Sequence, residues 1–290
     1  MIHHKIKPNI YTAMKYLFLI FVLLVILIPM LHVFAVSLSS DIRIMNGEVT
    51  IFPKGLNFEA YKFVLSDSNI LNSYMNTIVY TVVGTTLSLA TTASAAYALS
   101  KKKLFLQSFW MKLIIFTMFF GGGMIPSFIN VRNLGLYDTM WAVVLPGLVG
   151  SWNLIVMRSF FIAFPSDIEE SGRVDGLNDI GVFVYLVLPV SKAVLSTVGL
   201  FYAVGIWNSY FVPFLYLESQ SKFTLQMVLR SMLVSGTSLN AVTISGGDTT
   251  MVPETLKYAT VVVAILPIMA VYPFLQKYFV SGVMVGSVKG

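Results

Sequence analysis

The chain has 290 residues, of which 57% are hydrophobic and only 11% carry a charge, and its formal net charge is +6. A soluble domain carries about 25% charged residues, so this composition excludes a soluble globule and favours a protein embedded in lipid. A nucleic-acid reader gathers Lys and Arg on one exposed face or helix, whereas the basic residues here lie at the ends of apolar runs, so no nucleic-acid partner is expected.

Six apolar runs are long enough to cross a bilayer, which takes roughly 20 mainly apolar residues. The predicted spans are 16–37, 74–99, 113–131, 139–157, 194–217 and 258–276. The first run is too long for a removable signal peptide and lacks a small-residue cleavage site. The sequence therefore predicts an all-α polytopic membrane protein with six transmembrane helices. We divide it into an N-terminal region (1–73, with the tail, the first span and the first external loop), a transmembrane core (74–280) and a C-terminal tail (281–290).

The orientation follows from the distribution of Lys and Arg, which concentrate on the cytoplasmic side of membrane proteins. With both termini inside, twelve of the 19 basic residues are cytoplasmic and seven are external. The reverse orientation inverts that bias. We therefore expect a multi-pass protein of a bacterial plasma membrane with both termini cytoplasmic. An external loop is predicted at 218–257, with a helix over 223–234.

The cytoplasmic segment 165–190 is unusually ordered for a linker. Ser166 and Glu169 have the spacing of a capping box, so a helix is expected to begin near Asp167. Gly176 can take the left-handed conformation that closes a helix, and Asn178 can cap a second helix running toward Pro189. The pattern predicts helix, tight turn, helix. The small residues Ser171 and Gly172 are expected to leave one flank of the first helix bare, open to another protein.

Several absences narrow the function. The predicted spans contain no Asp, Glu, Lys or Arg, although ion-coupled transporters commonly carry such residues inside the membrane. No Gly-x-x-x-x-Gly-Lys-Ser/Thr phosphate loop and no His-Glu-x-x-His metal motif occurs, and the lack of Cys excludes thiolate metal sites. Gly121, Gly122 and Gly123 lack the following Lys and indicate a helix distortion or a close-packing site. We expect no catalytic site, no metal site and no cofactor in this chain, with energy supplied by a partner.

Two spans carry candidates for a translocation path. Small polar residues recur on one side of span two from Thr77 to Thr92, which favours close helix packing and leaves a polar path wall as the alternative. Span five carries an aromatic and polar cluster suited to a sugar or to the interfacial belt. The candidate residues are Tyr202, Trp207, Asn208 and Tyr210.

The cytoplasmic segment resembles the signature of bacterial type I ABC importer permeases, Glu-Ala-Ala, three residues, Gly, then a distant Leu-Pro. The matching residues are Glu170, Ser171, Gly172, Asp175, Gly176, Leu188 and Pro189. Ser171 and Gly172 replace the two alanines. Further matches are 120–126, 133–136, Trp207-Asn208 and 278–290, so the resemblance covers most of the chain from 74 onward. Together these motifs are similar to the carbohydrate-uptake branch, and within it to permeases for oligosaccharides and polysaccharide fragments.

The resemblance implies that segment 165–190 is a coupling helix seated in a groove of an ATPase subunit. It also implies a heterodimer with a second homologous permease, two ATPase subunits that bind ATP and Mg, an external solute-binding protein and a carbohydrate substrate. An ion-coupled secondary transporter and a non-transporting membrane scaffold are the alternative interpretations. The first would move substrate without ATP, and the second would not stimulate an ATPase.

Overall fold

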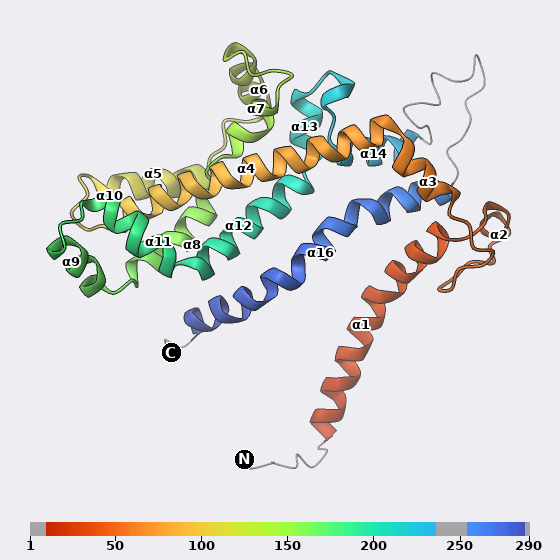
Figure 1. Cartoon of the computed structure of the whole chain (residues 1–290), viewed down its shortest axis with the longest axis horizontal. Helices are drawn as coiled ribbons and strands as arrows, with labels where there is room; N and C mark the ends of the chain where they lie inside the picture. Colours follow the sequence, from red (N-terminus) through yellow and green to blue (C-terminus); the bar gives the residue numbers. More distant parts are fainter. Residues whose placement is uncertain (1–9, 236–253, 288–290) are drawn as a thin grey trace. The chain divides into compact units, whose positions relative to one another are not determined.

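The computed structural model describes residues 10–235 and 254–287 (Figure 1). Every regular element in these ranges is a helix, and three helices are long and apolar enough to cross a membrane by themselves. They are α1 (Ile10–Ser37), α4 (Ser68–Ser100) and α16 (Glu254–Ser287), the last over its stretch Glu254–Pro273. The first residues of the predicted C-terminal tail therefore continue a helix.

Three bent pairs of helices pass the same test of length and composition. The first is α5 (Gln107–Phe119) with α6 (Met124–Asn133), bent by 115°. The second is α7 (Met140–Val144) and the 3-10 turn η1 (Leu145–Gly147) with α8 (Ser151–Ile162), bent by 50°. The third joins Asp179–Val190 to α12 (Lys192–Trp207) at 84°. If each bent pair is one span, the described chain has up to six, which agrees with the predicted all-α polytopic class.

The predicted spans 113–131, 139–157 and 194–217 are each interrupted, and the first is interrupted at the distortion predicted for 121–123. Helix α5 ends at Phe119, and Gly123 precedes α6 with φ +85°, a conformation that favours glycine. A Cβ at Gly121 or Gly122 would meet nothing within 4 Å, so these residues mark a helix break and not a close-packing site. Helix α12 ends at Trp207, before the short α13 (Phe211–Tyr216).

The chain forms two compact units. One comprises Met1–Ser68 and Leu229–Ile265, and the other comprises Asn69–Val228 and Leu266–Gly290. In the first unit, the 38–67 segment forms α2 (Asp41–Met45) and α3 (Glu59–Ser66), and Thr255 Oγ1 donates to Asp41 Oδ1 at 2.6 Å. His32 Nδ1 lies 2.7 Å from the Thr50 carbonyl oxygen. Because a carbonyl only accepts, Nδ1 carries the proton, and His32 is a hydrogen-bonded packing residue.

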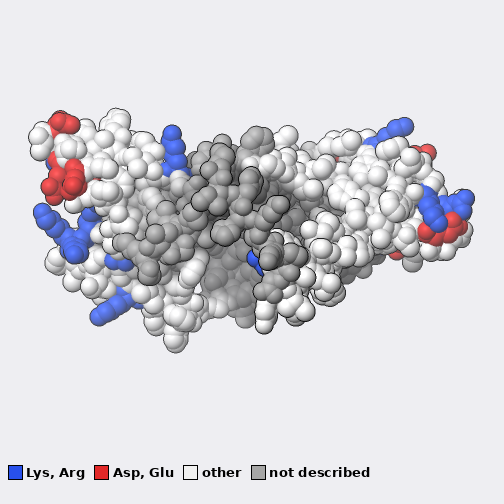
Figure 2. Space-filling model, turned by 90° about the horizontal axis from the view of Figure 1, so that it is seen from below, with Lys and Arg blue, Asp and Glu red and all other residues white. Residues whose placement is uncertain are grey.

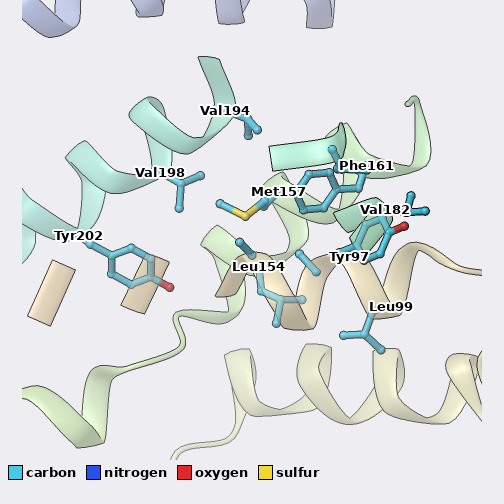
Figure 3. Close-up of a cluster of buried hydrophobic side chains, with 12 residues drawn as sticks. Tyr97, Leu99, Leu154, Met157, Phe161, Val182, Val194, Val198 and Tyr202 are labelled. Atoms are coloured by element: carbon cyan, nitrogen blue, oxygen red, sulfur yellow. The ribbon is translucent and has the colours of Figure 1, made fainter. Parts of the chain in front are cut away.

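The core of the second unit lies between α4, α8, α12 and the segment that follows α9 (Ser166–Val174). Figure 3 shows Met157 and Phe161 of α8 between Tyr97 of α4 and Val198 of α12. Met157 and Val198 are completely buried. α12 passes close to α4 at Gly84, where a Cβ would lie 2.7 Å from Ile206 Cδ1. This core fixes the segment 175–191 against the transmembrane helices.

Asp138 fastens the loop after α6 to the loop after α13. Its backbone is left-handed, with φ +54°. Its carboxylate accepts from the Glu218 and Ser219 backbone N–H groups at 2.9 and 3.0 Å, from Ser219 Oγ at 2.6 Å and from Lys222 Nζ at 2.7 Å. Burial raises the pKa of Asp138, but the hydrogen bonds from Lys222 and Ser219 outweigh it and hold the pKa well below its usual range. Helix α14 (Leu225–Ser235) begins shortly after Lys222, so these bonds to Asp138 fix where it starts. Its bounds are close to those of the predicted helix 223–234.

We expect Asp138→Asn to lower the free energy of unfolding by about 1–3 kcal/mol, because four donors lose a charged acceptor. Asn tolerates the left-handed backbone, so the change isolates the charge. The pKa of Asp138 is depressed in the folded state, so its contribution is complete above the unfolded value of about 3.9 and is lost only as pH falls below it.

The melting temperature of the purified protein should therefore differ between wild type and Asp138→Asn equally at pH 7 and pH 5. The difference should shrink in more acidic buffer. A difference that is already lost at pH 5 would contradict the stabilising role of the Asp138 carboxylate. Lys222→Met is the matched variant, and it should lower the melting temperature with the same pH dependence.

Candidate functional site

Helix α9 is short and closed at its C-terminal end by a Schellman motif. The Leu177 N–H donates to the Gly172 carbonyl at 2.9 Å, and the Gly176 N–H donates to the Arg173 carbonyl at 3.1 Å. Gly176 has φ +85°, as this motif requires. The predicted end of the helix near Asp175 is confirmed, since α9 ends at Val174.

The predicted capping box is wrong. Pro165 occupies the position before the helix, and Ser166 is already helical, so its hydroxyl caps no backbone N–H and donates only to Asp167 at 3.4 Å. Glu169 does not reach back to the helix start. Its side chain is only 12% exposed and pairs with Lys101 Nζ.

The Lys101–Glu169 ion pair connects α9 to the end of α4. The same ammonium lies 4.1 Å from the centre of the Tyr97 ring. The end of α4 is further held because the Leu99 carbonyl accepts from Arg158 Nε at 2.9 Å and from Gln107 Nε2 at 2.8 Å. These contacts attach α9 to a helix that is long and apolar enough to cross a membrane. Sequence reasoning did not find this pair, because its partners lie 68 residues apart in the chain.

The second helix of the segment begins as predicted, with Asn178 Oδ1 accepting from the Gly181 N–H at 2.8 Å. It consists of α10 (Asp179–Gly181), the π-helical η2 (Val182–Val187) and α11 (Leu188–Val190). Pro189 has no N–H to donate and its ring crowds the carbonyl four residues earlier, so the wider π turn before it accommodates the proline. Ser191 Oγ then donates to the Val187 carbonyl at 2.7 Å, where the chain turns into α12.

The outer face of α9 combines carboxylates with an apolar side chain. Glu170, Ser171 and Asp175 are exposed, and Val174 is 87% exposed. Gly172 is buried instead of leaving an open flank, since a Cβ there would clash with Leu186 Cδ1. Its small size therefore serves packing inside the segment, and a partner protein can reach only the opposite face.

Of the path candidates, Tyr202 is a structural residue. Its side chain is buried, and its hydroxyl lies 2.7 Å from Thr92 Oγ1 and accepts from the Gly150 N–H at 2.9 Å. It thereby joins α4, α8 and α12. Thr77 and Thr92 in the small polar series of α4 are also buried and hydrogen-bonded, as close packing predicts.

Trp207 lines a cavity of about 760 Å³ formed by α4, α12 and α16. The other lining residues are almost all apolar, including Ile78, Phe201 and Tyr272, with Thr81 among them. The Trp207 ring meets Tyr74 edge-on, with centroids 5.9 Å apart. Asn208, the C-cap of α12, is exposed, and Tyr210 stacks on Phe214. The candidates thus differ in their surroundings, with Tyr202 packed between helices and Trp207 beside a cavity.

A second cavity, of about 520 Å³, lies at the broken span. It is lined by 121–124 together with Ser209, Phe211 and residues of α13 and η1. Irregular backbone at membrane depth is tolerated where it is buried in protein or lines a water-filled cavity. The three consecutive glycines predicted the distortion, but the cavity that they line also depends on α13 and η1, which their sequence position does not reveal.

Comparison with known proteins agrees with this architecture. No model of a protein family matches the chain. It is 42% identical to Protein LplC of Bacillus subtilis (strain 168), across 99% of this chain and 98% of that protein. It is 37% identical to the polygalacturonan/rhamnogalacturonan transport system permease protein YtcP of the same organism, across 98% and 100%. A solved bacterial ABC transporter involved in import of the acidic polysaccharide alginate matches with TM-score 0.86, 32% identity, and coverage of 96% and 100%.

The fold and these relatives define a permease subunit of an ABC transporter, a multi-pass protein of the inner membrane. The chain belongs to the carbohydrate-uptake branch of the permeases of binding-protein-dependent importers. It is a transport subunit and not an enzyme, and ATP is hydrolysed by separate subunits. Importers of this kind contain a partner permease, an ATPase and a binding protein, and the permease chain has no known cofactor. Neither a secondary transporter nor a scaffold fits this family.

The ion pair that connects α9 to α4 can be tested with two Gln variants of the same segment. Glu169→Gln leaves the largely buried Lys101 ammonium without its carboxylate, so we expect a loss of about 1–3 kcal/mol in unfolding free energy. Arg173→Gln breaks the exposed Arg173–Asp179 pair, whose side chains are 47% and 79% exposed. That loss should stay below about 1 kcal/mol.

The measurement is the melting temperature of the purified complex, with Lys101→Glu/Glu169→Lys as a rescue variant. The swapped pair should recover part of the loss. Equal melting temperatures for Glu169→Gln and Arg173→Gln would show that the Lys101–Glu169 pair stabilises the protein no more than the exposed pair does.

Proposed function

We propose that α9 is the helix through which an ATPase drives transport, and that its docking face consists of Glu170, Ser171, Val174 and Asp175. The observation that carries this proposal is an 87% exposed Val174 on an acidic, capped helix that is connected to α4 through Glu169. Gly172 and Gly176 act from within the segment, the first by admitting Leu186 and the second by ending α9. Leu188 and Pro189 lie at the other end of the segment, where the chain turns into α12.

The proposed assembly is a heterodimer with a second homologous permease, two ATPase subunits that hold ATP and Mg, and an external solute-binding protein. Both termini and α9 lie on the cytoplasmic side in this arrangement. The bias of Lys and Arg toward that side supports it. The external solute-binding protein then faces the 38–67 segment and the predicted 218–257 loop, of which residues 236–253 lie outside the described part of the chain.

The proposed translocation path includes the cavity at 121–124 and the cavity beside Trp207. Asn208 is exposed in the connection between α12 and α13. Aromatic faces and a few polar groups suit a sugar. Two relatives are named for polygalacturonan/rhamnogalacturonan and for alginate import. We propose an oligosaccharide fragment of a polysaccharide as the substrate, with Tyr202 supporting the path from behind and Tyr210 at its edge.

The assembly is tested by tagging the chain, extracting it gently from its native membrane and identifying what co-purifies. An ATPase and a second six-span protein are expected. Uptake of a labelled oligogalacturonate into vesicles should then require both ATP and the solute-binding protein. Uptake without ATP would contradict the coupling role of α9.

Asp175→Arg should abolish substrate-stimulated ATP hydrolysis while leaving membrane insertion intact, because the exposed residue changes sign at the proposed docking face. We expect at least a tenfold loss, since a like-charge contact at an interface costs several kcal/mol and 1.4 kcal/mol is a factor of about ten. The assay is ATPase activity of the reconstituted complex, with Glu59→Arg on α3 as the matched control.

The same face can be mapped by cross-linking. The chain has no native Cys, so Ser171→Cys provides a single exposed thiol. It should cross-link to the ATPase. Cross-linking only to lipid or to the second permease, together with normal activity of Asp175→Arg, would place the ATPase elsewhere.

A further inference from the structure

The turn that joins α4 to α5 carries three consecutive lysines with different surroundings. Lys101 faces inward, where it pairs with Glu169 and lies over Tyr97. Lys102 and Lys103 are exposed, and in the described ranges 10–235 and 254–287 neither has a carboxylate partner. Lys112, further along α5, is likewise exposed and has no ion pair within those ranges.

Exposed aromatic side chains accompany these cations. Phe105 is 81% exposed, and Phe109 and Trp110 at the start of α5 are 52% and 46% exposed. The last two rings contact each other edge-on with centroids 5.4 Å apart. Aromatic rings gather where the lipid head groups begin, and lysines near helix ends extend their ammonium groups to the same level. The turn therefore lies at head-group depth.

The charges of the neighbouring α9 indicate what these lysines bind. Its exposed carboxylates include Asp167, Glu170 and Asp175, whereas its Arg173 is paired with Asp179. Figure 2 shows acidic and basic side chains in separate groups at the end of the second unit that carries α9, at the left of the view. A protein surface that complements α9 is basic, and it would repel Lys102 and Lys103. A bilayer supplies phosphate anions at that level instead.

We propose that Lys102 and Lys103 form a binding site for the phosphate of an anionic phospholipid, whose acyl chains lie against Phe105 and Trp110. The site is separate from the proposed docking face of α9. Because Lys101 in the same turn holds Glu169, a bound lipid restrains the turn to which α9 is attached. The lipid composition of the membrane thereby affects how firmly the coupling segment is held.

The test uses the purified complex with its partner permease and ATPase, and native mass spectrometry counts the lipids that it retains from an equal mixture of phosphatidylglycerol and phosphatidylcholine. The Lys102→Gln/Lys103→Gln variant removes the two charges. Each lysine near an anionic surface contributes about fivefold in affinity, so the preference for phosphatidylglycerol should fall by roughly 25-fold. Substitutions on exposed surface barely change stability, so the melting temperature should stay the same.

Lys54→Gln/Lys62→Gln is the matched control, because it removes two exposed lysines from the other unit. It should keep the preference for phosphatidylglycerol. An equal fall in both double variants, or no fall in either, would overturn the proposal.

Two further measurements distinguish a bound lipid from a bound phosphate ion and from a protein contact. Excess inorganic phosphate should leave the retained phosphatidylglycerol unchanged, and complete displacement by phosphate would identify an ion site and reject the lipid. Loss of the ATPase from Lys102→Gln/Lys103→Gln with unchanged lipid retention would assign the lysines to a protein contact and equally reject the proposal. Lipid retention is measured without transport, so its outcome is independent of whether α9 couples to ATP hydrolysis.

Discussion

The structure depends on one constraint, which is that a backbone N–H or C=O group in lipid needs a partner within the protein. Continuous helices satisfy it in α1, α4 and α16. Where a span breaks, the freed groups must find other partners. At the break before α8, the Gly150 N–H donates to the Tyr202 hydroxyl, while the break at 121–123 borders a cavity. The broken spans are therefore where the chain either locks its helices together or exposes polar backbone to a solute.

The segment 165–190, which carries α9, is connected to these spans at both of its ends. At one end Glu169 joins α9 to the lysine turn after α4. At the other, the helix from Asp179 to Val190 turns by 84° into α12, whose Tyr202 bonds to Thr92 on α4. α9 is thus attached to α4 by two routes, one through an ion pair and one through α12. The second route passes through the well-packed core of Figure 3, to which Val198 and Tyr202 of α12 belong.

Local chemistry predicted much of this arrangement. The apolar runs predicted α1, α4 and α16 and the bent pairs that bring the spans of the described chain to as many as six. Gly176 predicted the end of α9, and Asn178 predicted the start of the next helix. The predictions that were wrong concern contacts between residues far apart in the sequence. The capping box was a valid local alternative for Glu169, but an ammonium 68 residues away is a stronger partner for a buried carboxylate than a backbone N–H. The open flank at Gly172 also failed, because spacing along the chain does not reveal that Leu186 folds back onto it.

The π-helical turn Val182–Val187 has a geometric consequence. A π turn is equivalent to an α-helix that has received one extra residue, and each residue of an α-helix accounts for about 100° of rotation. The wider turn therefore takes up the extra residue locally, and the chain on either side keeps the orientation that regular winding would give it. A residue deleted from regular α12 would rotate everything beyond the deletion by about 100°, whereas a residue deleted from this π turn should leave the acidic face of α9 where it is. Val182–Val187 is thus the stretch between α9 and α12 that can change its length by one residue without turning α9.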